Sequence, residues 1–177
     1  MDIQRLLGFE QADITYAPLA VLPDDLRHSY HSTSDVGGTW QPTETGSLIT
    51  YDPTLIRMPI TLISVLAHEL LHERLSWASE LPPGEAEAHE LNTDLHCFTT
   101  GPGGIQSQGA EAIGWQGYMR QSSRIHALAL FLLVRRIDAG QAKPHLSSRA
   151  NRALARAFAH LESKTNVINA LQVLLDS

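Results

Sequence analysis

The chain has 177 residues, of which 43% are hydrophobic, and it carries a formal net charge of −6 and a single cysteine. This length and apolar content fit one domain, residues 1–177, with its own core, whereas the negative charge argues against a nucleic-acid partner and one cysteine excludes an internal disulfide. No stretch has the pattern of a signal peptide or a membrane span, so the sequence predicts a cytoplasmic protein without a membrane partner.

The N-terminal part predicts a small sheet. Residues 3–9 form a short amphipathic start, and the sequence is then loop-like up to residue 35. Residues 46–51 alternate in polarity and contain β-branched residues, which is typical of a strand. Such a strand offers either a free backbone edge that pairs with an extended peptide or an ordinary sheet edge. Trp40 belongs to the same sheet region, about 37–51, as a core residue or a cleft residue, with the core favoured.

An apolar run from Pro59 to about Ala78 predicts a buried helix, with proline in the first turn, where its missing N–H costs nothing. The run contains the pentapeptide His-Glu-Leu-Leu-His. Two imidazoles four residues apart lie about one turn apart on one helical face, so His68 and His72 can bind a single metal ion. The carboxylate of Glu69 points beside that ion, where it can take a proton from a metal-bound water and act as general base.

A second helix is predicted over residues 84–98, with Gly101 and Pro102 as helix-stop residues. Residues 81–84 and 101–104 are expected to be loops within the domain. Within it, Glu90 and Asp94 stand at i and i+4, so both side chains face the same way. This pair follows the His-Glu-x-x-His motif after 17 intervening residues.

Together the two patterns resemble the gluzincin metallopeptidases, of which thermolysin is the familiar member. The segment His-Glu-x-x-Thr-Asp-Leu, the Gly-Pro-Gly-Gly that follows it and a Gly-Tyr ahead of an apolar helix also look like small, largely uncharacterised bacterial zinc peptidases. The resemblance covers roughly residues 46–135. It implies Zn²⁺ as the cofactor, Glu90 as the third zinc ligand, and Asp94 as the residue that orients His68 or His72.

The ligand types also indicate a catalytic rather than a structural ion. Two imidazoles and one carboxylate leave a coordination position open, whereas a structural zinc uses four ligands, usually with several cysteines, and the chain has only Cys97. His89 is an alternative third ligand if the second helix is rotated by one residue, Glu87 shares a face with Glu90, and His96 lies roughly on the opposite arc. Glu90 is preferred because it alone leaves a carboxylate at i+4 to orient a ligand histidine.

Attack on a carbonyl also needs a donor to the oxyanion besides the metal. Residues 124–134 predict a buried, nearly all-apolar helix that His126 interrupts, and polar groups in such places have a reason to be there. His126 is therefore the predicted catalytic donor, with a core histidine bonded to a backbone carbonyl as the equal alternative. Tyr118 and Arg124 are weaker candidates.

The C-terminal segments 147–161 and 167–175 predict further helices. The expected fold is α+β and mostly helical: a reduced zincin-like fold with a small sheet, a metal-binding helix pair and a C-terminal helical bundle. Too little chain remains for the large C-terminal lobe of full-sized gluzincins. The cleft is therefore expected to be shallow, or to be completed by a partner protein or by a second copy in a homo-oligomer.

Three functions fit this site. The first is a zinc-dependent metallopeptidase or amide hydrolase that acts on a peptide or protein substrate. The second is a non-haem Fe(II) oxygenase that modifies a peptide, because two histidines and one carboxylate also form the facial triad of that class. The third is a non-catalytic binding protein with a peptidase-like frame, against which the presence of Glu69 argues.

Overall fold

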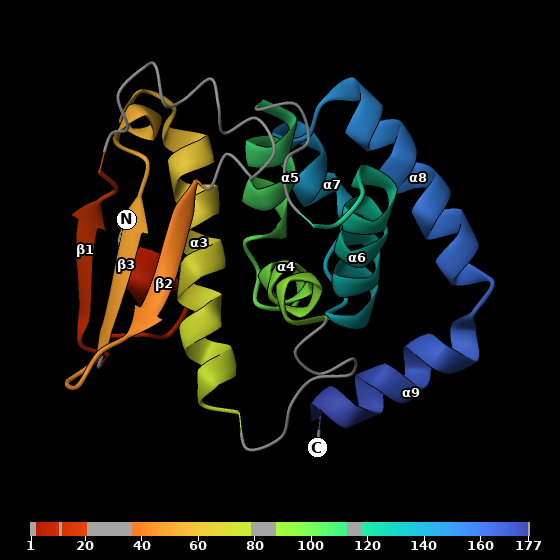
Figure 1. Cartoon of the computed structure of the whole chain (residues 1–177). Coiled ribbons are helices and arrows are strands. Elements are labelled where there is room, and N and C mark those ends of the chain that lie inside the picture. Colours follow the sequence, from red (N-terminus) through yellow and green to blue (C-terminus); the bar gives the residue numbers. More distant parts are fainter. Residues whose placement is uncertain (1–2, 11, 21–36, 79–87, 113–117, 177) are drawn as a thin grey trace. The chain divides into compact units, whose positions relative to one another are not determined.

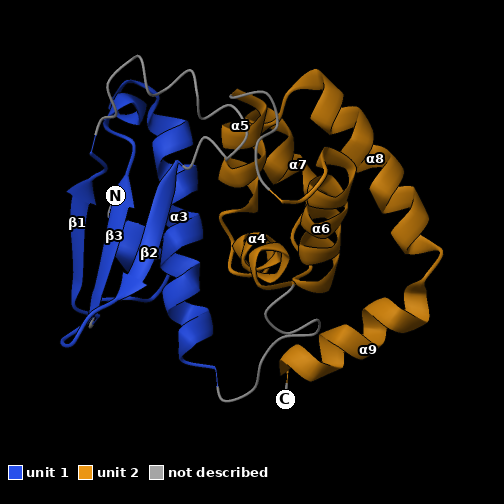
Figure 2. Ribbon diagram, viewed as in Figure 1, with its two compact units in different colours: residues 1–81 blue, residues 82–177 orange. Residues whose placement is uncertain are grey.

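The computed structural model describes residues 3–10, 12–20, 37–78, 88–112 and 118–176. Over these residues the chain is α+β, mostly helical with a small mixed sheet. It divides into two compact units, Met1–Leu81 and Pro82–Ser177, which Figure 2 shows in different colours. The expectation of one zincin-like domain stays a prediction. Within the described ranges, no helix combines the length and the apolarity needed to cross a bilayer.

Unit 1 contains a three-stranded sheet (Figure 1). Its strands are β1 (Ile14–Pro18), β2 (Gly38–Pro42) and β3 (Ser47–Tyr51), in the spatial order β1-β3-β2. β3 pairs parallel with β1 and antiparallel with β2, and Trp40 lies opposite Ile49. The predicted strand at 46–51 is therefore confirmed as β3. The free edge expected for it is wrong, because β3 is the central strand and both of its edges are already paired.

Helix α3 (Pro59–Ser76) packs against β2 and β3 and supplies much of the core of unit 1. It confirms the predicted helix, ending two residues before Ala78. The 3-10 turn η2 (Pro53–Arg57) leads into it, and α3 also packs against the short helix α1 (Ile3–Leu6). The buried apolar cluster consists of Leu7, Phe9, Ile49, Ala67 and Leu70.

Unit 2 is built from helices over its described residues (Figure 1). They are α4 (His89–Thr99), α5 (Gly103–Ala112), α6 (Gln121–Val134), α7 (Ala139–Ala142), the 3-10 turn η4 (Lys143–His145), α8 (Ser148–Glu162) and α9 (Thr165–Asp176). α6 packs against α4, α5, α8 and α9. The predicted C-terminal helical bundle is confirmed.

The turn between α4 and α5 is partly as predicted. Gly101 follows the end of α4 with φ +112°, a left-handed conformation that favours glycine, which confirms the predicted helix stop. The loop expected to continue through Gly104 is wrong, because α5 begins at Gly103. A Cβ on Gly103 would lie 2.4 Å from Cδ1 of Phe98, so the missing side chain lets α5 begin directly against this buried ring. The predicted loop at 81–84 and the predicted helix start at Gly84 lie outside the described residues.

Candidate metal centre

His68 and His72 face each other along α3. Their Nε2 atoms are 3.2 Å apart, and the two rings meet edge to face at 81° with centroids 4.8 Å apart. Two nitrogens bound to one tetrahedral zinc ion at about 2.0–2.1 Å lie about 3.3 Å from each other. The pair therefore has the spacing of two ligands of one ion, which follows from their i, i+4 positions on a continuous helix.

Glu69 lies beside this histidine pair. Its side chain is buried, and Oε2 is 4.0 Å from Nε2 of His72, which is beyond hydrogen-bond distance. Strand β2 covers it closely, since a Cβ on Gly38 would lie 3.1 Å from Cγ of Glu69. The carboxylate is thus close to the candidate ligand nitrogens and shielded from bulk solvent, which is the setting that a base acting on one water molecule would need.

A second buried carboxylate, Glu73, joins the sheet to α3. Its Oε2 accepts hydrogen bonds from Nε1 of Trp40 at 2.8 Å and from the hydroxyl of Ser47, and its Oε1 accepts one from Nε1 of Trp77 at 3.0 Å. The Trp40 ring stacks on His72, with planes at 23° and centroids 6.2 Å apart. The sequence does not predict this hydrogen-bond network around Glu73. A glutamate inside an apolar helix signals that donors are needed, but it does not say which ones.

In unit 2, Glu90 and Asp94 lie one turn apart on α4, as their spacing predicts. Glu90 is partly buried and Asp94 is 3% exposed. Oδ2 of Asp94 accepts hydrogen bonds from the backbone N–H groups of Tyr118 at 3.0 Å and Met119 at 2.9 Å, and from Nη2 of Arg124 at 2.9 Å. Three donors of its own unit therefore hold the Asp94 carboxylate in place.

The alternative third ligands have less support from their neighbours on α4. His89 and His96 both lie on this helix and are partly buried, but Asp94 is one turn from Glu90 and not from either histidine. Glu87 lies outside the described residues.

Arg124 and Tyr118, the weaker candidates for an oxyanion donor, are both linked to Asp94. The guanidinium of Arg124 is buried, and its Nε also donates to the Met119 carbonyl at 3.0 Å. Its main role in unit 2 is that of counter-ion to Asp94. The Tyr118 side chain is 58% exposed, and only its backbone N–H bonds to Asp94 in the contacts just described.

His126 is partly buried in unit 2, where its ring lies beside that of His160 on α8, with centroids 5.5 Å apart. It follows Arg124 by two residues, which places the two side chains about 200° apart around α6. Since Arg124 faces α4, His126 lies on the other side of α6 and faces α8. The role of His126 as a donor to the oxyanion stays a prediction.

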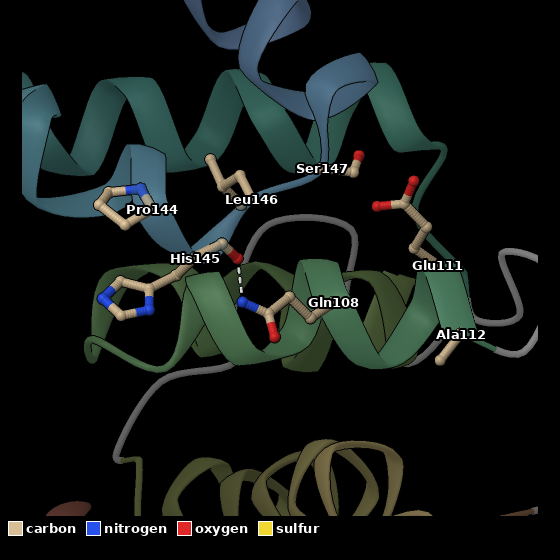
Figure 3. Close-up of a pocket in the computed structure, with 7 residues that line it drawn as sticks. All are labelled: Gln108, Glu111, Ala112, Pro144, His145, Leu146 and Ser147. Atoms are coloured by element: carbon tan, nitrogen blue, oxygen red, sulfur yellow. Dashed lines mark hydrogen bonds between the residues drawn. The ribbon is translucent and has the colours of Figure 1, made fainter.

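A surface hollow of about 550 Å³ in unit 2 lies apart from these residues, between α5 and the start of α8 (Figure 3). The side-chain amide of Gln108 bonds there to the carbonyl of His145. Ser147, also in its wall, caps α8 by accepting a hydrogen bond from the N–H of Ala150. The side chains of Gln108 and Ser147 thus bond to the local backbone, and none of the candidate metal ligands lines the hollow.

Comparisons of the chain with protein-family models, with curated proteins and with solved structures find no match. The resemblance to gluzincins therefore depends on the motif residues themselves.

Proposed function

We propose that the protein is a zinc-dependent peptidase or amide hydrolase in which His68, His72 and Glu90 bind the ion and Glu69 is the general base. The observation that carries this proposal is the 3.2 Å between the two histidine Nε2 atoms, a spacing that suits two ligands of one zinc ion. Among the described residues, these histidines and Glu90 are a group of side chains that could hold a metal. Two imidazoles and one carboxylate leave a position for water or substrate.

Zinc, when bound, lowers the pKa of a water molecule and polarises the carbonyl of the substrate. Glu69 accepts the proton that the attacking water loses and delivers it to the nitrogen of the leaving amine. One water is thereby added across the C–N bond, and the Glu69 carboxylate returns to its starting state. The burial of Glu69 strengthens its electrostatic interactions during these steps, because little solvent screens them.

Asp94 is proposed to orient one of the ligand histidines. A histidine that binds a metal through one ring nitrogen commonly donates its other N–H to a carboxylate, which fixes the ring and its tautomer. The hydrogen bonds to Oδ2 from Arg124 and two backbone N–H groups keep the Asp94 carboxylate in one orientation. A fixed acceptor can impose a fixed ring orientation.

Glu69 also favours hydrolysis over the other two functions. Neither a facial-triad oxygenase nor a binding protein needs a carboxylate at the position of Glu69, beside the histidine pair. Burying a carboxylate costs free energy, and the role of general base gives a reason for that cost. Metal analysis separates zinc from iron, and dependence on oxygen and 2-oxoglutarate would indicate the oxygenase.

The variant Glu69→Gln tests the proposal. The amide has nearly the same volume but cannot accept the proton, so we expect zinc to stay bound while kcat/KM on a mixed peptide library falls about 10²- to 10⁴-fold. The matched control Glu162→Gln changes an exposed glutamate on α8 and should keep full activity. Hydrolysis that survives in Glu69→Gln would assign the base to another group, and a zinc-loaded wild type that cleaves no peptide or amide would refute the hydrolase proposal.

A further inference from the structure

We propose that Trp40 is a positioning residue of the metal centre: fixed by Glu73, its indole holds the imidazole of His72 in the orientation that directs Nε2 toward His68. This inference rests on the proposed function, because it assigns the residue that prepares one ligand for the ion. The residues involved all belong to unit 1.

The close approach of strand β2 to helix α3 places the indole of Trp40 beside His72. Gly38 and Trp40 are two residues apart on β2, so they face the same side of the strand. A Cβ on Gly38 would lie 2.7 Å from Cγ1 of Val65 on α3, which shows that the missing side chain permits this close approach. Two residues further along the strand, the Trp40 ring reaches His72 and stacks on it.

Glu73 fixes the indole in its plane. Nε1 of Trp40 is 2.8 Å from Oε2 of Glu73 and 3.1 Å from Oγ of Ser47, and this hydroxyl itself donates to the same carboxylate oxygen. Because Oε2 has donors from two different strands, β2 and β3, the indole cannot rotate without losing hydrogen bonds.

The consequence for His72 is a restricted ring. Its side chain is 8% exposed, and the ring stacks on the indole at 23°, so the indole limits the space in which the imidazole can turn. A ligand that is already oriented loses less conformational entropy when the ion binds. Trp40 should therefore raise the affinity for metal although it supplies no ligand atom.

Three variants separate positioning from packing. Trp40→Phe keeps an aromatic face beside His72 but removes the N–H donor, and Trp40→Leu removes both. Trp77→Phe is the matched control, since it also removes an indole donor from Glu73, while its ring packs on Phe9, with centroids 5.3 Å apart, rather than on His72.

The experiment measures Zn²⁺ affinity by competition with a chelator, together with the Co²⁺ absorption spectrum and the thermal midpoint of the metal-free chain. We expect Trp40→Leu to weaken Zn²⁺ binding about ten- to a hundredfold and to change the Co²⁺ spectrum, because residues that orient ligands have effects of this size. Trp40→Phe should recover part of the affinity. Trp77→Phe should bind Zn²⁺ as the wild type does, even where it lowers the thermal midpoint as much as the Trp40 variants.

Two results would overturn the inference, and each refutes a different part of it. A wild-type affinity and Co²⁺ spectrum in Trp40→Leu would refute the positioning role alone and leave the proposed function standing. A wild-type chain that binds neither Zn²⁺ nor Co²⁺ would refute the metal centre itself.

Discussion

Asp94 and Arg124 form an ion pair that is almost completely shielded from solvent. Both side chains are 3% exposed, and Nη2 and Oδ2 are 2.9 Å apart. A charge that loses its partner in such surroundings stays desolvated, so removing one member of a buried pair is more costly than the pair's net stabilisation suggests. The pair thus ties the residue proposed to orient a zinc ligand to the stability of unit 2.

Arg124→Met should lower the free energy of unfolding by about 3–5 kcal/mol, because it removes the guanidinium that neutralises the buried Asp94 carboxylate. Urea denaturation of the metal-free protein measures this difference. Arg136→Met is the matched control: its partner is Asp176, the two side chains are 67% and 65% exposed, and its loss should cost about 0–1 kcal/mol. Equal losses in the two variants would contradict the account of the pair.

Single residues of the site could be predicted only where their partners are local. Spacing of i, i+4 on a helix predicts that two side chains share one face, as His68 and His72 do on α3 and Glu90 and Asp94 do on α4. Two donors to Glu73, Ser47 and Trp40, lie 26 and 33 positions away in the sequence. No periodicity relates such distant segments. The sequence therefore indicates that Glu73, inside an apolar helix, needs hydrogen-bond donors, but it does not identify them.

The pairing of β2 with α3 determines the candidate centre at the level of secondary structure. β2 contributes Gly38 beside Glu69 and Trp40 beside His72, so one strand contacts both the proposed base and a proposed ligand. The strand can approach this closely because Gly38 has no side chain. A methyl group there would meet Val65 at 2.7 Å and the Thr50 carbonyl at 2.8 Å.

Gly38→Ala should therefore move β2 away from α3 and lower the free energy of unfolding by about 1–3 kcal/mol, as overpacking does. Urea denaturation again gives the value. Gly104→Ala is the matched control, because a Cβ there meets no atom within 4 Å and the change should be neutral or stabilise by up to about 1 kcal/mol. A neutral Gly38→Ala would mean that the strand and helix are not as close as the structure shows.

Elements with strong patterns were predicted and short or glycine-rich ones were not. The apolar run of α3 and the alternation in β3 identified these elements. β1 has only five residues and ends in proline, and it becomes a strand through its parallel pairing with β3, which lies about 30 residues on. α5 begins with two glycines that usually end helices, but here Gly103 allows close packing on Phe98.

For the whole molecule, the proposed zinc ligands come from both compact units of the chain. His68 and His72 belong to unit 1, whereas Glu90 and Asp94 belong to unit 2. The α+β class, the small sheet and the C-terminal bundle are confirmed, while the zincin-like identity stays a proposal. The identity of the third ligand, Glu90 or His89, decides between the gluzincin pattern and an all-histidine set.

The most direct test compares the zinc stoichiometry and affinity of the wild type with those of Glu90→Ala and His89→Ala. We predict one zinc ion per chain and a loss of affinity in Glu90→Ala that is at least about a hundredfold larger than in His89→Ala, because only Glu90 donates a ligand atom. Wild-type affinity in Glu90→Ala, or a larger loss in His89→Ala, would contradict the proposed metal centre.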